Sequence, residues 1–142
     1  LNKMVEDVRD DPLVWGVHDC FTFINAAHDA VTDEQLEAGW LGDYSTGLQA
    51  RKHYLTKLKE TGHRDIVAAL DFKLSRNVTR ARGSIVARRL EADGVLGYAL
   101  GVVVSDRIAF LTLNGLDFAL PQEGDIFWSW LVTYNLGSMS TV

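Results

Sequence analysis

The sequence predicts an α+β protein in which N-terminal helices pack on a C-terminal antiparallel β-meander. Helical periodicities and helix caps fill the chain up to Asn77, and β-rich segments separated by short turns fill the rest. A chain of 142 residues, 47% hydrophobic and 23% charged, has the size and composition of one globular domain. We therefore expect a single domain over residues 1–136 and a flexible tail over residues 137–142.

Helices are expected in the first half of the chain, at residues 2–10, 19–33, 45–62 and 64–74. The second of them has the strongest pattern, because Asp19 is a suitable N-cap and apolar residues follow at helical spacing. Its apolar face is formed by Cys20, Phe23, Ile24, Ala27, Ala30 and Val31. The intervening residues 34–43 contain two glycines and are expected to form a loop or a broken helix.

Strands are expected in the second half, at residues 83–90, 97–104, 107–113, 116–120 and 126–133. Turn sequences separate most of them, and Asn114-Gly115 is the strongest hairpin signal. Strands that follow one another through short turns favour an antiparallel meander. The order of elements thus places the helices together on one face of the sheet.

Charge and cysteine content exclude several classes of function. The net charge of −5 disfavours a general phosphate-binding surface, so we expect no nucleic-acid partner. No apolar run is long enough to span a bilayer. A single cysteine without zinc-ligand spacing predicts no disulfide, no metal site and no cofactor. One basic group remains, which forms either a solvated face or a patch for an acidic neighbour: Arg76, Arg80, Arg82, Arg88 and Arg89.

One cluster could carry chemistry, the segment Trp15-Gly16-Val17-His18-Asp19-Cys20. Cys20 would begin a helix, where the helix dipole and free amides favour a thiolate over a thiol. Such a thiolate is a competent nucleophile if an imidazole reaches it, and His18 is the nearest in sequence. The structural alternative is that Cys20 packs on the apolar face of its helix while His18 fixes the preceding turn.

This segment resembles the Trp-Gly-x-His-Asp-Cys signature of a phage and prophage family of unknown function, whose members commonly lie among tail genes. That family is similar to the NlpC-type cell-wall hydrolases, which are papain-like cysteine peptidases. The resemblance covers about Pro12 to Val132, with weaker matches at residues 42–46, 82–86 and 99–102. It implies a papain-like, NlpC-like fold.

The sequence departs from the NlpC pattern at the catalytic histidine. NlpC-type enzymes carry it at the start of the second strand, two residues before a glycine, and here that position is Ala99. No histidine follows His63, and Ser84 replaces the aspartate of the motif that begins the first strand. The enzyme question stays open, but the departures weigh against catalysis.

The resemblance therefore favours a virion structural protein of the tail, neck or tail tip that has lost catalysis. Such a protein would be made in the host cytoplasm, reside in the virion and bind other tail proteins as a multi-copy ring. The alternative is a cysteine peptidase or amidase that cleaves peptidoglycan as the genome enters the cell. Cys20 would then be the nucleophile, and His18 or a group supplied by a partner would be the base.

Tryptophans are the candidate contact residues for such partners. Trp128 and Trp130 alternate on one face of the last expected strand, and Trp40 lies in the glycine-containing loop. Aromatic side chains on loops and edge strands are common at protein interfaces. The alternative for the strand pair is burial in the core.

Overall fold

The computed structural model describes residues 1–33, 36, 40, 42, 44–76, 80–90 and 96–129. In this part of the chain four helices precede six strands, which confirms the α+β class. The helices are α1 (Asn2–Val8), α2 (Cys20–Thr32), α3 (Gly47–Thr61) and α4 (Ile66–Lys73). The strands are β1 (Ser75–Arg76), β2 (Ile85–Arg89), β3 (Tyr98–Val104), β4 (Arg107–Thr112), β5 (Gly115–Ala119) and β6 (Ile126–Ser129). The expected tail at residues 137–142 lies outside the described residues.

Helix starts follow the caps that the sequence contains. Asp19 is in an extended conformation and accepts a hydrogen bond from the Thr22 amide at 2.9 Å, as an N-cap should. Thr46 caps α3 in the same way, and Asp65 caps α4 by accepting from the Ala68 amide at 2.8 Å. Because these contacts are local, α2 begins where the sequence predicts.

The strands form one antiparallel sheet in the order β1-β6-β2-β3-β4-β5. The meander expected from the sequence is present from β2 to β5. The last strand departs from it, because β6 returns to the free edge of β2, where Phe127 pairs with Val86. The two-residue strand β1 then pairs with β6 and was not expected from the sequence.

The hairpin expected at Asn114-Gly115 is present, but its turn lies one residue earlier, at Leu113-Asn114, because Thr112 pairs with Gly115. Gly115 has a φ of +102°, and a Cβ atom there would lie 2.6 Å from the Arg9 carbonyl oxygen. The neighbouring Leu116 amide donates to that same carbonyl at 2.9 Å. Glycine therefore lets the hairpin lie against the chain that follows α1.

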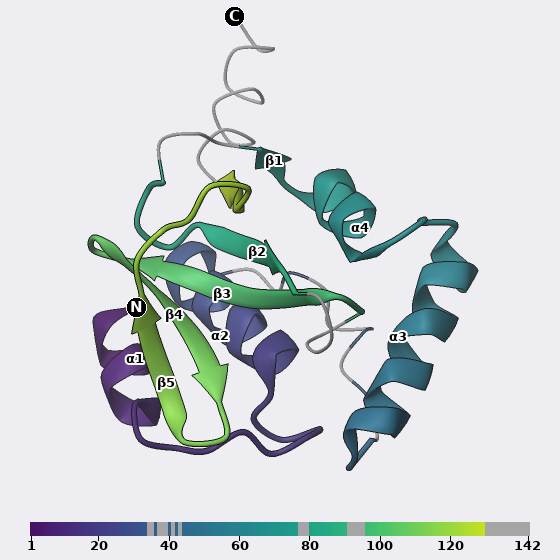
Figure 1. The fold of residues 1–142 in the computed structure, drawn as a ribbon, viewed down its shortest axis with the longest axis horizontal. Helices are drawn as coiled ribbons and strands as arrows, with labels where there is room; N and C mark the ends of the chain where they lie inside the picture. The colour runs from purple at the N-terminus through teal and green to yellow at the C-terminus, as the bar shows by residue number, and fades with distance from the viewer. Residues whose placement is uncertain are drawn as a thin grey trace, which may run out of the picture.

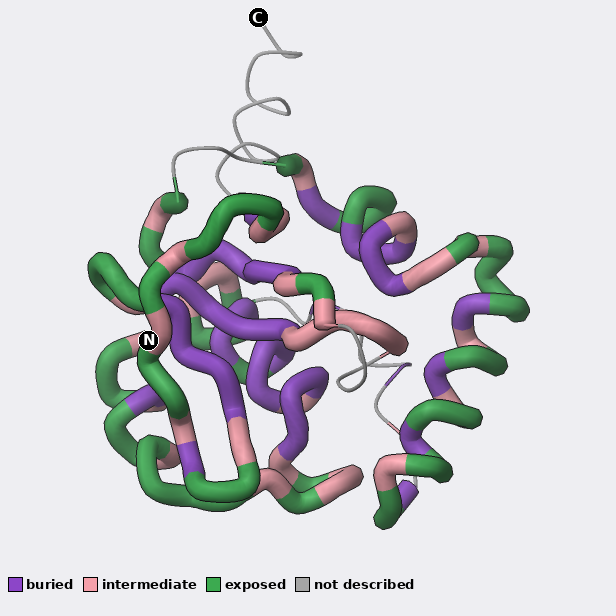
Figure 2. Tube along the Cα trace, in the orientation of Figure 1, coloured by how far each residue is buried: buried purple, intermediate pink, exposed green. Residues whose placement is uncertain are grey.

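Helices cover one face of the sheet, with α2 behind the central strands and α3 and α4 to one side (Figure 1). Alternate residues of β2 and β3, such as Ile85 and Val102, join Ile24 of α2 in the larger core cluster. The intervening residues face the other way and form a second, smaller cluster that includes Val86 and Val103. Figure 2 shows the resulting buried centre of the sheet, with exposed residues mainly at its turns.

A buried ion pair contacts the smaller cluster. Arg88 of β2 bonds Asp125 through two side-chain nitrogens, at 2.9 and 2.8 Å, and only 2% of the Asp125 side chain is exposed. The Arg88 guanidinium also lies 4.8 Å from the ring centroid of Phe110. Arg88 thus belongs to the packing of the sheet.

Candidate functional site at the start of helix α2

The segment before α2 forms a tight corner. Val14 and His18 exchange two backbone hydrogen bonds of 2.8 Å, so the chain reverses within these residues. Gly16 lies at the tip with a φ of +83°, in the left-handed region that favours glycine. A Cβ atom on Gly16 would collide with the carbonyl oxygen of Tyr44, so the corner packs directly on the segment that leads into α3.

Asp19 holds this corner to the helix. Its carboxylate is fully buried, and each oxygen accepts one backbone hydrogen bond. One oxygen accepts from the Gly16 amide at 3.0 Å and the other from the Thr22 amide at 2.9 Å. The Thr22 hydroxyl accepts in return from the Asp19 amide at 2.7 Å, which completes a capping box. Asp19 therefore joins the turn to the first turn of α2.

Cys20 begins α2 and belongs to the larger core cluster, with 9% of its surface exposed. Burial raises the pKa of the Cys20 thiol far above its ordinary value of 9.0, and the adjacent Asp19 carboxylate raises it further. Backbone amides at the helix start lower this pKa, in the direction that the sequence predicts, but their effect is smaller. Cys20 is a protonated thiol near neutral pH.

Two tyrosines that the sequence analysis did not select lie beside this corner. The hydroxyls of Tyr44 and Tyr54 hydrogen-bond to each other, and both residues are buried. Burial raises the pKa of both hydroxyls, and the negative charges of Asp19 and of ionised Cys20 raise them further. The available signal was the placement of Tyr54 on the apolar face of α3, where a tyrosine needs a partner for its hydroxyl.

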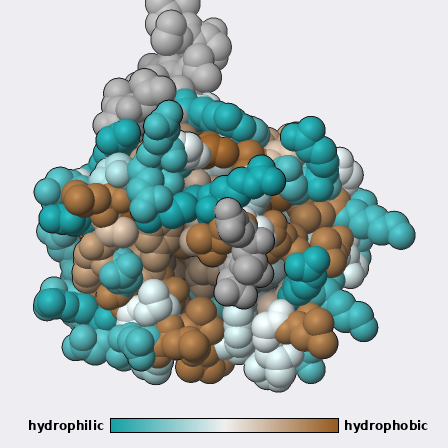
Figure 3. Space-filling model, viewed as in Figure 1, coloured by the Kyte–Doolittle hydropathy of each residue, from teal (hydrophilic) through white to brown (hydrophobic). Residues whose placement is uncertain are grey.

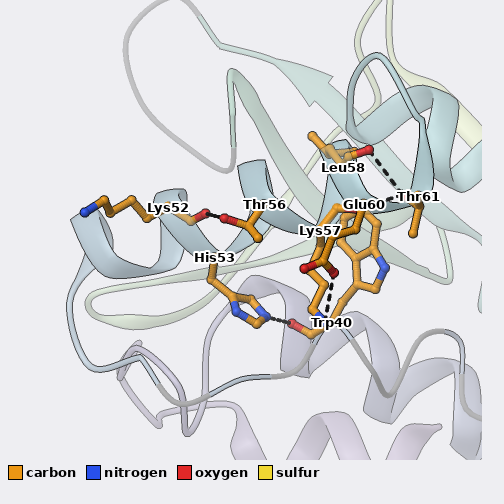
Figure 4. A network of polar contacts seen from close by, with 8 residues as sticks. All are labelled: Trp40, Lys52, His53, Thr56, Lys57, Leu58, Glu60 and Thr61. Carbon is orange, nitrogen blue, oxygen red and sulfur yellow. Dashed lines mark hydrogen bonds and ion pairs between the residues drawn. The ribbon is translucent and has the colours of Figure 1, made fainter.

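Among the described residues, no histidine side chain forms a hydrogen bond with the Cys20 thiol. Nε2 of His18 is buried and has no hydrogen-bond partner there. His53 instead bonds the Trp40 carbonyl through Nε2 at 2.7 Å (Figure 4) and packs on Tyr44 with 5.3 Å between ring centroids. His63 packs on Phe72. The structure thus shows no assembled cysteine–histidine pair in its described part.

The strand position that matches the NlpC histidine points away from α2. Ala99 packs against the smaller cluster, on the sheet face opposite the helices. Its neighbour Tyr98 packs against the helix-side core instead. Ser84, which replaces the motif aspartate, is 1% exposed, and its hydroxyl has no hydrogen-bond partner among the described residues.

Two of the three candidate contact tryptophans, Trp40 and Trp128, belong to the core. For Trp128 this is the alternative that the sequence analysis left open. Trp40 is 5% exposed and stacks on Phe21 with 5.9 Å between ring centroids. Trp128 is 1% exposed and donates its indole N–H to the Asp71 carboxylate at 2.8 Å. Both side chains are therefore largely buried in this structure. Trp130 lies outside the described residues.

Three of the five arginines in the basic group contact other side chains of the protein. Arg76 bonds Asp71 at 2.8 Å, Arg88 bonds Asp125, and Arg80 lies over the Phe127 ring. In the described ranges no group of three or more His, Cys, Asp and Glu side chains could hold a metal ion. Nor does any helix there have the length and apolar character that crossing a membrane requires.

Fold and site together define an α+β domain with a buried turn-to-helix corner before α2. Its sequence belongs to the family described as a domain of unknown function, DUF6950, which matches residues 1–130. No curated protein and no solved structure matched the chain.

Proposed function

We propose that this protein is a non-catalytic structural component of a phage particle, in the tail, neck or tail tip, built on an NlpC-like scaffold. Its place in a virion rests on the resemblance of the Trp15–Cys20 segment to the phage and prophage family. Other tail proteins are the proposed partners, in a multi-copy ring.

The observation that carries the non-catalytic part is the state of Cys20. The thiol is buried and protonated, with a carboxylate as its neighbour. A nucleophilic cysteine needs the reverse surroundings, namely a positive neighbour and access to substrate. The polar groups of the corner meanwhile serve the turn and the helix cap.

Alkylation of Cys20 tests this part of the proposal. Because Cys20 is the only cysteine, each adduct of iodoacetamide reports on that one thiol. We expect almost no adduct by mass spectrometry in the folded protein at neutral pH, and one adduct per chain in urea. The Cys20→Ala variant is the control and should give none in either condition. Rapid stoichiometric alkylation of the folded protein would contradict a buried structural thiol.

Particle association tests the structural role. The protein should be found in purified particles from a strain that carries its gene, and cross-linking should join it to tail proteins. Size-exclusion chromatography should also show several copies together. A free monomer that is absent from purified particles would contradict this role.

A working cysteine peptidase or amidase is the second candidate, and one observation favours it. His18 Nε2 is buried without a hydrogen-bond partner in the described structure, two residues before Cys20. A buried polar atom without a partner is costly and occurs at catalytic sites. This candidate predicts that wild-type protein releases soluble fragments from purified peptidoglycan, whereas Cys20→Ala and His18→Ala do not. Our proposal predicts no release by any of the three proteins.

A further inference from the structure

We propose that the cavity between α1, the β3–β4 turn and β5 binds a small phosphomonoester, with the phosphate held by Arg9, Arg82 and Arg107. The cavity has a volume of about 290 Å³, close to the lower limit for small-molecule sites. It lies beside α1, on the left in Figure 1. Cys20 is not among its described lining residues, so the inference is independent of the proposed structural role.

The three arginines come from separate parts of the chain and line one cavity. Arg9 follows α1, Arg82 precedes β2, and Arg107 is the first residue of β4. Only Arg82 belongs to the basic group noted in the sequence, and the fold brings the other two to the same cavity. A planar guanidinium can donate two parallel hydrogen bonds to phosphate oxygens. Three of these groups around one space therefore favour an oxyanion that offers several oxygens.

The guanidinium groups have donors available for a ligand. In the described part of the chain, none of the three arginines forms an ion pair. Arg82 donates a hydrogen bond to the side-chain oxygen of Asn2, which is neutral and also lines the cavity. Because a guanidinium carries five N–H donors, this contact leaves most of the Arg82 donors for a ligand.

Glu6 is the one acidic side chain among the described lining residues. It forms no ion pair with the arginines there, so the described lining carries an excess of two positive charges. A phosphomonoester carries about 1.5 to 2 negative charges near pH 7, which matches this excess. A carboxylate carries only a single negative charge, so a phosphate is favoured as the end group of the ligand.

Three other acids are close in sequence to the arginines but are not among the described lining residues. Asp7 pairs with Lys3 at 3.2 Å. Asp106 accepts a hydrogen bond from the hydroxyl of the preceding serine at 3.3 Å. Asp10 packs at the end of the β4–β5 hairpin, where its Cα would lie 3.1 Å from a Cβ atom on Gly115. Within the described lining, one carboxylate therefore opposes three guanidinium groups.

The cavity also has an apolar wall. Val5 of α1 is 8% exposed, Val104 of β3 is half-buried and Phe118 of β5 is 36% exposed. Figure 3 shows hydrophilic surface in teal beside hydrophobic surface in brown on the left side of the molecule. Such a wall can contact the organic group of a phosphate ester while the arginines hold its phosphate. An ester with an aromatic or short aliphatic group therefore fits the cavity better than inorganic phosphate.

Calorimetric titration with phenyl phosphate tests the proposal, and two ligands that each contain one part of it are the controls. Inorganic phosphate lacks the ring, and phenol lacks the charge. We expect saturable binding of phenyl phosphate, about three- to tenfold weaker binding of inorganic phosphate and no measurable binding of phenol. Absence of saturable phenyl phosphate binding would overturn the proposal, as would phenol binding of equal strength.

Variants of the lining test the location of the site. Arg107→Gln should weaken phenyl phosphate binding by about five- to tenfold, because it removes a charged donor pair. Glu6→Gln should tighten binding by about two- to fivefold, because it removes the opposing carboxylate. Arg89→Gln is the matched control, since Arg89 is exposed on β2 and is not among the described lining residues. It should leave the affinity unchanged.

Circular dichroism melts establish that each variant tested is folded. Equal losses in Arg107→Gln and Arg89→Gln would show that binding follows net charge, which would overturn the site. A Glu6→Gln variant that binds no more tightly than wild type would also contradict it. Phosphatidic acid vesicles present the same phosphomonoester group on a membrane. Binding to these vesicles without binding to phenyl phosphate would exclude a small-molecule site.

Discussion

Gly16, Asp19 and Cys20 have separate structural tasks in the corner before α2. Gly16 allows the close approach of the Tyr44 carbonyl, Asp19 caps the helix, and Cys20 fills space in the core. Packing and helix capping therefore account for all three residues, and the Cys20 thiol is buried and protonated.

Replacing Gly16 by alanine tests the packing of the corner. Gly16→Ala should lower the free energy of unfolding by about 3 kcal/mol or more, because left-handed strain adds to a collision with Tyr44. Gly124→Ala is the matched control, since Gly124 also has a positive φ of +91° but nothing lies near its added Cβ. It should cost only about 1–2 kcal/mol of backbone strain. Urea unfolding measures both values, and equal costs would refute the collision.

Substitution of Cys20 separates a core residue from a nucleophile. Cys20→Ser should lower the free energy of unfolding by about 1–3 kcal/mol, because it places a hydroxyl in the apolar cluster. Cys20→Ala removes the sulfur without adding a polar group and should cost less than Cys20→Ser. Urea unfolding of the three proteins gives the comparison. A Cys20→Ser variant as stable as wild type would indicate a solvated thiol.

At the scale of elements, predictability depends on how local the determining contacts are. The N-caps of α2 and α3 and the hairpin between β4 and β5 are determined within a few residues, and the sequence predicts each of them to within one residue. Strand β1 has two residues, which is too short for any periodicity. The pairing of β6 with β2 joins residues about forty positions apart, so no local pattern specifies it.

The cap of α4 offers a test at this scale. Asp65→Ala removes the hydrogen bond to the Ala68 amide and should destabilise the protein by about 1 kcal/mol. Asp65→Asn keeps an oxygen acceptor and should retain most of that stability. Both variants lose the exposed contact with Arg64, so their difference isolates the cap. Thermal unfolding followed by circular dichroism measures it, and equal melting temperatures for the two variants would argue against the cap.

At the scale of the whole molecule, one thiol and two phenol hydroxyls that ionise only at alkaline pH are buried in the described structure: Cys20, Tyr44 and Tyr54. Their pKa values in the folded chain are raised above the ordinary values of 9.0 for cysteine and 10.0 for tyrosine. Above these ordinary values the unfolded chain loses protons that the folded chain keeps. The stability that the raised pKa values supply is therefore complete below about pH 9 and is lost as the pH rises.

Alkaline unfolding measures this linkage. The free energy of unfolding should fall between about pH 8.5 and 11 in urea titrations of the wild type. The Cys20→Ala variant should show a shallower fall beginning at a higher pH. The double variant Tyr44→Phe/Tyr54→Phe removes both partners of the hydroxyl pair and should be shallower above about pH 10. Identical slopes for all three proteins would show that these groups are solvated.

The sequence by itself determined the α+β class and the start of α2 at Asp19, because each depends on neighbouring residues. Only the tertiary structure decided the state of the Cys20 thiol, since burial by distant elements outweighs the local effect of helix amides on its pKa. It also brought Tyr44 and Tyr54 to the corner and placed Ala99 on the far face of the sheet. Burial and sheet pairing depend on residues far apart in the chain, and these decide whether a cysteine at a helix start is a nucleophile or part of the core.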